Sequence, residues 1–172
     1  MIDTKIIKSI LANGGWCELN PKSSRPIKNR LNGRLIYDSD DYLVIERFNV
    51  TLESLDGFYI PIKQNIKKLD KSNWIKKYLT VGGRVIENTE IPNIFISLSW
   101  QELLAKLKDH KEVIKILFDS NSEIGIIESF NEQELEIRIL GVFNSKRLIN
   151  ITASSIICLE LRSKELSQVK KR

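Results

Sequence analysis

Apolar and polar residues in the first part of the chain follow the pattern of a short helix, a series of strands and a second helix. The helical spacing begins behind Asp3, a good helix cap, and stops at Gly14 and Gly15. A period of two then predicts strands in the runs WCEL, GRLIY, YLVIERF and FYIPI, with the polar turn DSDD between the second and the third. This part closes with a very short strand and a helix whose apolar face holds Trp74, Ile75, Tyr78 and Leu79.

Pro61 lies inside the run FYIPI. Proline has no amide hydrogen to donate to a neighbouring strand. We therefore expect this strand at an edge of its sheet, or with a bulge at Pro61.

Residues 80–98 contain a glycine pair, a proline and no sustained period until IFISL, and we interpret them as a linker whose end pairs as a strand. Ser99 and Glu102 form a capping box at the start of a helix, and its apolar face holds Trp100, Leu103, Leu104 and Leu107. Beyond it the period changes to two, and five short strands are predicted in the runs EVIKILF, EIGIIESF, ELEIRIL, RLINI and SIICLEL.

The two parts of the chain resemble each other when the sequence is shifted by 92 positions. Gly33 then falls on Gly125, and the apolar positions and the polar turn that follow also coincide. A shift of about 90 aligns FYIPIKQNIKKL with LINITASSIICL. We interpret the chain as two copies of one helix-plus-barrel unit, with the first at 1–79, the linker at 80–98 and the second at 99–172.

A short helix followed by five antiparallel strands is the element order of small barrels, and the second part resembles the Sm-like (Hfq-like) superfamily. Gly125, Ile127, Phe130 and Asn131 occupy the first part of that family's first motif. The resemblance implies a mainly β fold of two tandem Sm-like or SH3-like barrels, each preceded by a helix, as in uncharacterised bacterial proteins of this architecture. The aspartate, asparagine and arginine-glycine residues that bind nucleotides in RNA-binding members have no counterparts here, so the resemblance implies the fold and no activity.

The net charge of +5 lies in the first half, mostly in residues 20–34, which contain five cations and no acid. Such a segment is the one part of the chain that composition favours for contact with RNA or single-stranded DNA, through stacking of bases on nearby aromatic rings as well as through charge. The candidate residues for nucleic-acid binding are Lys22, Arg25, Lys28, Arg30, Arg34, Trp16, Tyr37 and Tyr42.

Other chemistry-bearing residues fit structural roles. The cluster Asp38, Asp40 and Asp41 is typical of a solvated turn, and His110 sits where a histidine favours a helix C-terminus. The two cysteines are expected to be buried thiols because they form neither a disulfide framework nor a metal motif. No P-loop, nucleophile elbow or zinc motif is present, so we expect no enzyme, no metal and no cofactor.

No run approaches the roughly 18 apolar residues of a membrane helix, and the N-terminus lacks the pattern of a secretion signal, so we expect a cytoplasmic protein without a membrane partner. The leading functional hypothesis is a non-catalytic module that binds a protein partner through exposed barrel edges or the groove between the copies. The alternatives are RNA or single-stranded DNA binding through residues 20–34 and a toxin-immunity role. The sequence leaves homo-oligomerisation open.

Overall fold

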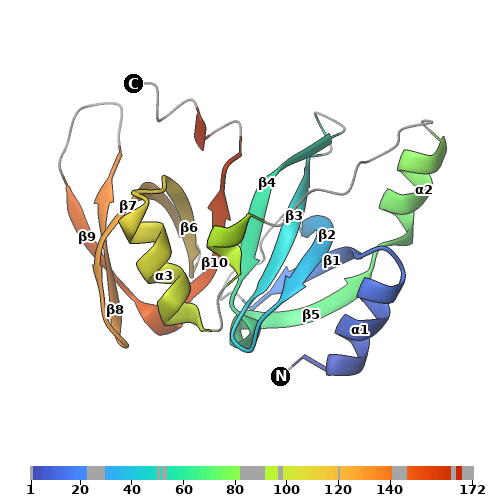
Figure 1. Ribbon diagram of the computed structural model, residues 1–172, viewed down its shortest axis with the longest axis horizontal. Helices are drawn as coiled ribbons and strands as arrows, with labels where there is room; N and C mark the ends of the chain where they lie inside the picture. The colour runs from blue at the N-terminus through green and yellow to red at the C-terminus, as the bar shows by residue number, and fades with distance from the viewer. Residues whose placement is uncertain are drawn as a thin grey trace.

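The computed structural model describes residues 2–22, 30–49, 51, 54–81, 92–96, 99–119, 121–140, 147–163 and 166–167, and these form a mainly β protein (Figure 1). The helices are α1 Thr4–Ala12, α2 Asn73–Val81 and α3 Trp100–Asp109, with 3-10 turns η1 Lys63–Asn65, η2 Asn93–Phe95 and η3 Ala153–Ser155. The strands are β1 Trp16–Pro21, β2 Leu31–Asp38, β3 Leu43–Asn49, β4 Ser54–Pro61, β5 Ile66–Lys71, β6 Ile114–Phe118, β7 Asn121–Phe130, β8 Glu134–Ile139, β9 Leu148–Thr152 and β10 Ile156–Leu161.

All of these strands join in one open antiparallel sheet with the order β5-β1-β2-β3-β4-β10-β6-β7-β8-β9. The sheet does not close on itself, because β5 and β9 are its two ends in the described part of the chain. The expectation of a mainly β fold with short helices is confirmed, whereas two separately closed barrels are not what the strand pairing gives. The strand that follows all the others in the sequence, β10, lies at the centre of the sheet.

The two halves of the sheet have the same strand order. In the first half the order is β5-β1-β2-β3-β4, and in the second half it is β10-β6-β7-β8-β9. In each half the fifth strand along the chain lies beside the first, and the other strands follow in sequence order. The second strand of each half carries a bulge against the third, between Leu35 and Tyr37 in β2 and between Ile127 and Ser129 in β7. A 3-10 turn joins the fourth and fifth strands in each half. These positions are the ones that shifts of 92 and about 90 place together in the sequence.

Gly33 and Gly125 occupy equivalent places where the second strand crosses the third. A Cβ added to Gly125 would lie 2.4 Å from Ile137 Cγ2 and 2.5 Å from the carbonyl oxygen of Arg138. A Cβ added to Gly33 would lie 2.1 Å from the carbonyl oxygen of Glu46. Glycine is therefore required at both positions by the close approach of a neighbouring backbone.

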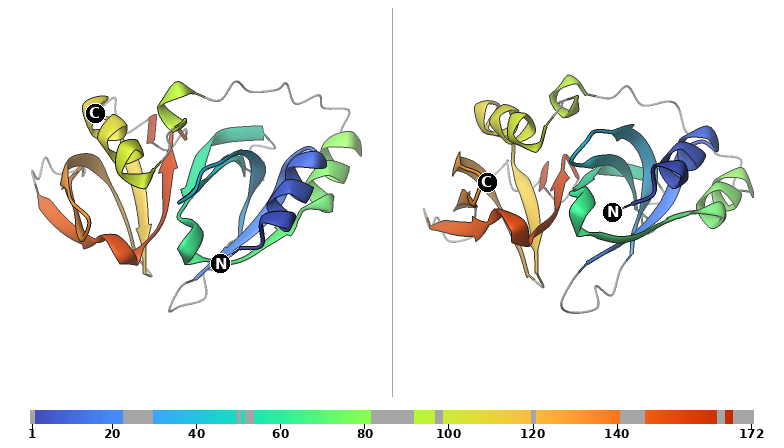
Figure 2. Two further views of the ribbon diagram at one scale, coloured as in Figure 1. Left: turned by 60° about the horizontal axis from the view of Figure 1, so that its bottom comes forward. Right: turned by 90° about the horizontal axis from the view of Figure 1, so that it is seen from below.

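Two large hydrophobic cores lie on either side of β10, and every residue of this strand is buried. Ile156, Leu159 and Leu161 pack into the larger core, which contains the second half of the sheet, α3, η2 and the outer face of β4. Ile157 and Cys158 pack into the core of the first half, beneath α1. Figure 2 shows α3 beside the strands of the second half, and α1 and α2 together at the far end of the first half.

The seam between the halves is the pairing of β10 with β4, in which Leu159 lies opposite Ile60 and Leu161 opposite Phe58. An ion pair crosses this seam from Arg47 on β3 to Glu160 on β10, and Glu160 is only 4% exposed. A second buried carboxylate, Asp56, lies 4.0 Å from the same guanidinium. One arginine thus neutralises acids from both halves, in a place where an unpaired carboxylate would be costly.

The local sequence signals are confirmed. Asp3 accepts a hydrogen bond from the amide of Lys5, Ser99 accepts one from the amide of Glu102, and the chain leaves α1 with positive φ angles at Gly14 and Gly15.

The expectation for Pro61 is wrong, because β4 is paired on both sides and has no bulge at Pro61. Proline is tolerated there as the last residue of the strand, and the next hydrogen bond to β10 comes from the amide of Ile62 to the carbonyl of Ile157, at 3.2 Å.

The segment interpreted as a linker, 80–98, is only partly described. Residues 80 and 81 extend α2, and residues 93–95 form a 3-10 turn where the sequence had predicted the beginning of a strand. Ile94 and Phe95 are buried in the larger core, where Phe95 packs edge-on against Phe58 with ring centroids 4.7 Å apart. Part of the connection therefore belongs to the packed structure.

We predict that Gly33→Ala and Gly125→Ala each lower the free energy of unfolding by about 2–3 kcal/mol, because the added methyl group must push a paired strand away. Urea unfolding followed by circular dichroism measures this. Ser122→Ala, at an exposed position of β7, is the control and should change stability by less than about 0.5 kcal/mol. Unchanged stability of both glycine variants would contradict the close approach.

A second prediction concerns the seam. Arg47→Leu should lower the free energy of unfolding by about 3 kcal/mol, since it leaves the Glu160 and Asp56 carboxylates without their cation. Arg30→Leu removes an ion pair with Glu18 in which the arginine side chain is 62% exposed, and it should cost less than about 1 kcal/mol. Equal effects of the two variants in urea unfolding would show that the seam pair is no stronger than a surface one.

Candidate functional site

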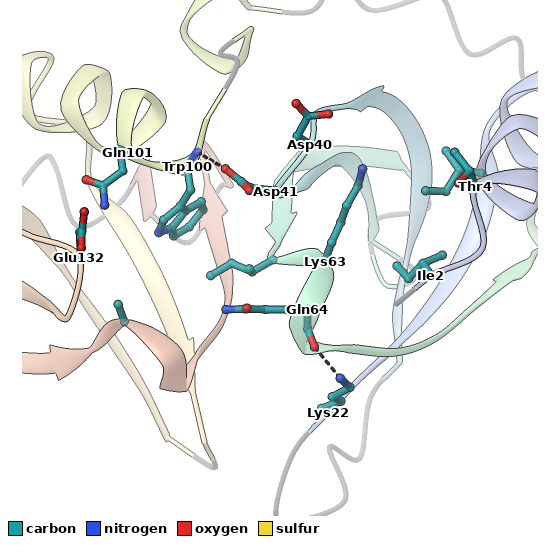
Figure 3. A pocket seen from close by; sticks show the side chains of 13 residues that line it. Ile2, Thr4, Lys22, Asp40, Asp41, Lys63, Gln64, Trp100, Gln101 and Glu132 are labelled. Carbon is teal, nitrogen blue, oxygen red and sulfur yellow. Dashed lines mark hydrogen bonds between the residues drawn. The ribbon is translucent and has the colours of Figure 1, made fainter.

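A cleft of about 580 Å³ opens where the two halves of the sheet meet (Figure 3). Its walls come from the start of α1, the β2–β3 turn, η1 and the end of β1 on one side, and from the start of α3, the β7–β8 turn and η3 on the other. We call it the seam cleft. It is lined by Ile2, Thr4, Ile7, Lys22, Asp40, Asp41, Ile62, Lys63, Gln64, Trp100, Gln101, Glu132 and Ala153.

Asp41 holds the two sides of the seam cleft together. Its carboxylate accepts a hydrogen bond of 2.9 Å from the backbone amide of Trp100, the first residue of α3, and its carbonyl accepts one of 2.8 Å from the amide of Lys63. A carboxylate suits this place because the first turn of a helix has free N–H groups and a partial positive charge. The ring of Trp100 packs edge-on against Tyr42, with centroids 6.1 Å apart.

Both lysines of the seam cleft already have partners within the chain. Lys63 pairs with Asp38 at 2.6 Å, and the ammonium of Lys22 donates to the carbonyl of Gln64 at 2.6 Å. The other charged side chains of the lining are the carboxylates of Asp40, Asp41 and Glu132. The arrangement offers hydrogen-bonding groups beside an aromatic ring, which is suited to binding.

The described cations of the candidate nucleic-acid segment make contacts within the protein. Arg34 donates two hydrogen bonds to Glu46, of 3.0 and 2.7 Å, in a largely buried position, and its guanidinium lies 6.0 Å from the centre of the Trp16 ring. Arg30 pairs with Glu18 on the neighbouring strand. Arg25 and Lys28 lie outside the described residues. Nucleic-acid binding by this segment stays a prediction.

The three aromatic candidates lie in two separate places. Trp16 is half-buried and packs edge-on against Phe48. Tyr42 is fully buried, and its hydroxyl donates a hydrogen bond of 3.0 Å to the carbonyl of Phe95. Tyr37 is half-buried beside Tyr42. Trp16 therefore lies with Arg34, whereas the tyrosines belong to the packing at the seam.

The other chemistry-bearing residues take the structural positions that the sequence indicated. The three aspartates lie in or beside the β2–β3 turn, and His110 is the C-cap of α3. Cys17 and Cys158 are buried free thiols. Among the described residues no group of histidine, cysteine, aspartate and glutamate side chains is arranged to hold a metal ion, and no described helix is long and apolar enough to cross a membrane.

The free edge of β9 is a candidate site that the sequence interpretation did not single out. Two hydrogen bonds at the ends of the ladder show which residues of β9 bond to β8: the amide of Ile139 donates to the carbonyl of Arg147, and the amide of Ala153 donates to the carbonyl of Gln133. Bonded and non-bonded pairs alternate in an antiparallel ladder. The amides that point away from β8 are therefore those of Leu148, Asn150 and Thr152.

The same three positions in the first half hold β10. Shifted by 90, Leu148, Asn150 and Thr152 correspond to Phe58, Ile60 and Ile62, which face β10 across the seam. Leu148 is 52% exposed, and the side chains of Asn150 and Thr152 are exposed as well. The sequence carried the signal in the alignment of FYIPIKQNIKKL with LINITASSIICL. The strand order was needed to see that a strand covers this edge in the first copy, whereas no described strand covers it in the second.

Comparison of this chain with models of known families, with curated proteins and with solved structures finds no match.

Burial raises the pKa of the Cys17 thiol to about 12 and raises that of Cys158 further still, with backbone hydrogen bonds opposing the shift only partly. Both thiols should thus stay protonated at pH 8 in the folded protein and react with a disulfide reagent at least about a hundredfold more slowly than in urea, since the thiolate is the reactive form. Absorbance of the released thiolate measures this rate. Fast reaction of two thiols without unfolding would contradict their burial.

Proposed function

We propose that this chain is a non-catalytic protein-binding module built from two copies of one Sm-like unit. The support for duplication is the repeated strand order, the repeated bulge and the equivalent glycines Gly33 and Gly125. The support for binding lies at the end of the sheet, where the second copy leaves open the edge that the first copy uses to hold a strand.

The observation that carries this proposal is the correspondence between the β4 and β9 edges. In the first half, the outward backbone groups of Phe58, Ile60 and Ile62 pair with β10. In the second half, no strand lies beyond β9 in the described part of the chain. A partner that supplies an extended segment would complete the ladder, which is the recognition mode called β-strand addition.

The two ends of the sheet differ in how well they are protected against pairing. The outer strand β5 has exposed lysines at positions 67, 68 and 71, and charged side chains are a common means of keeping an edge strand from pairing. The strand β9 has no charged residue and exposes Leu148. An open edge of this kind favours β9 over β5 as the binding site.

Nucleic-acid binding receives less support from the described cations. Arg30 and Arg34 are each committed to a carboxylate, and a cation that already has a partner contributes less to phosphate binding. We therefore retain RNA or single-stranded DNA as the alternative ligand and a protein segment as the leading one.

A change at Asn150 tests the proposal. Asn150→Pro removes an amide that points away from β8, so the sheet should still fold, whereas an added strand would lose a hydrogen bond and meet the proline ring. The measurement is the amount of partner protein that the nuclease-treated chain retains from lysate. We expect Asn150→Pro to retain at least about tenfold less than the wild type, because one missing backbone hydrogen bond and a steric clash cost more than about 1.4 kcal/mol.

The matched control is Asn150→Thr, which changes the same side chain but keeps the amide. It should retain the partner at the wild-type level. Retention by Asn150→Pro, with a circular dichroism spectrum like that of the wild type, would exclude strand addition at β9. Loss of all retained material on nuclease treatment would favour the nucleic-acid alternative.

A further inference from the structure

The outer faces of the third and fourth strands differ sharply between the two halves. In the first half, the outer face of β3, its preceding residue and β4 carries five apolar residues that are buried in the larger core, Tyr42, Val44, Phe58, Ile60 and Ile62. Glu46, opposite Phe58 on the same face, is buried in an ion pair with Arg34. At the equivalent positions of β8 and β9 the second half has Glu134, Glu136, Leu148, Asn150 and Thr152. The first face is built for permanent burial within the chain, and the second for contact with water or with a polar partner.

Two carboxylates dominate the chemistry beside the open edge. Glu134 lies opposite Thr152 and Glu136 opposite Asn150. Glu134 is exposed and Glu136 half-buried, where it accepts a hydrogen bond of 2.9 Å from Ser129. The one cation on this face of β8, Arg138, pairs with Glu128 on β7 at 2.6 Å and lies opposite Leu148. Negative charge thus lies at the Thr152 end, and apolar surface at the Leu148 end.

We propose that β9 takes an extended basic segment of another protein, in which two cationic side chains face Glu134 and Glu136. This inference rests on the proposed function and names the chemistry of its partner. The direction follows from the seam, where the strand that pairs with β4 is antiparallel to it and meets Ile62, Ile60 and Phe58 in that order. A partner strand on β9 would meet Thr152, Asn150 and Leu148 in the same order.

The side chains of such a segment follow from this order. The residue facing Thr152 and the residue facing Asn150 are Lys or Arg, and the residue facing Leu148 is apolar. The two residues between them point to the inner face, where Ile151 is buried and Ile149 half-buried at the rim of the larger core. Apolar residues fit there. The partner sequence is therefore basic, apolar, basic, apolar, apolar, read from its N-terminal end.

A second copy of this chain fits the edge less well. Its free strand β5 would place Lys67 opposite Thr152 but Lys71 opposite Leu148, which is next to Arg138. At the seam the corresponding residues of β10 are Ile157 and Leu161, which are buried. Lys67 of β5 therefore matches the acidic end of the β9 edge, whereas Lys71 would lie against the apolar Leu148, where the seam has the buried Leu161.

Two synthetic peptides test the inference, each with capped ends and one threonine on either side of the motif. The basic peptide contains Lys-Val-Lys-Val-Leu and the acidic peptide contains Glu-Val-Glu-Val-Leu. At low salt we expect the basic peptide to bind the full-length chain roughly tenfold more tightly than the acidic peptide. The difference should shrink at high salt, because the ion pairs of the peptide lysines with Glu134 and Glu136 lie near the surface. Fluorescence anisotropy of labelled peptides measures both affinities.

Two variants separate the inference from the function on which it rests. Glu134→Gln with Glu136→Gln should abolish the preference for the basic peptide and leave the affinities of the two peptides similar. Asn150→Pro should weaken the binding of both peptides by at least about tenfold, and Asn150→Thr should weaken the binding of neither. A preference for the basic peptide that survives the double glutamine change overturns the pairing of the basic side chains with Glu134 and Glu136, and leaves strand addition standing. Affinities that Asn150→Pro does not lower overturn strand addition itself.

Two measurements on the unchanged protein do not depend on a variant that folds. Hydrogen exchange should show slower exchange at the amides of Leu148, Asn150 and Thr152 when the basic peptide is added, and no protection there would overturn the inference. Light scattering should give the mass of a single chain. A larger assembly in which those amides are protected without peptide would show that a second copy covers β9, and would also overturn it.

Discussion

The pairing of β10 with β4 is the constraint on which the rest of this structure depends. All six residues of β10 are buried: five of them divide between the two cores, and Glu160 pairs with Arg47. Because β10 contributes to the core of the first half and the outer face of β4 to that of the second, each half of the sheet has one wall that comes from the other. Without β10, the outer face of β4 would leave Phe58 and Ile60 in water beside an unpaired strand edge. Neither half can complete its core alone, and this explains why the sheet is continuous.

Much of the fold could be predicted from local sequence, because the relevant signals act over a few residues. The caps Asp3 and Ser99, the glycines that end α1 and the period of two in the last five strands all lead to the elements observed. The expectation that the strand of Pro61 lies at a sheet edge or carries a bulge was wrong, because it rested only on the missing amide of that residue. The amide that matters for the seam belongs to Ile62, and that depends on which strand lies beside β4. Sequence proximity could not reveal it, because β10 is about a hundred residues away.

The candidate sites show a similar limit. Residues 20–34 contain five cations and no acid. In the structure, however, Arg34 pairs with Glu46 and Arg30 with Glu18 across neighbouring strands. Two of the five cations are thus paired with acids across the sheet. The β9 edge escaped notice for the opposite reason, since LINIT has no distinctive residue. It becomes a candidate only because the strand order leaves it at an end.

If the two halves are copies of one unit, the positions at which they differ indicate which surfaces face the interior of this chain. Where β10 has Ile157 and Leu161, β5 has Lys67 and Lys71, and where the first half has Tyr42 and Val44, the second has Glu134 and Glu136. These residues are thus apolar where they pack at the seam, and their equivalents towards both ends of the sheet are charged. The charges differ between the ends, lysines on one and glutamates on the other. Solubility alone does not require an edge strand without charged residues, nor an exposed leucine such as Leu148 on it. β9 has such an edge beside the glutamates of β8, which is why β9, and not β5, is the end suited to a partner.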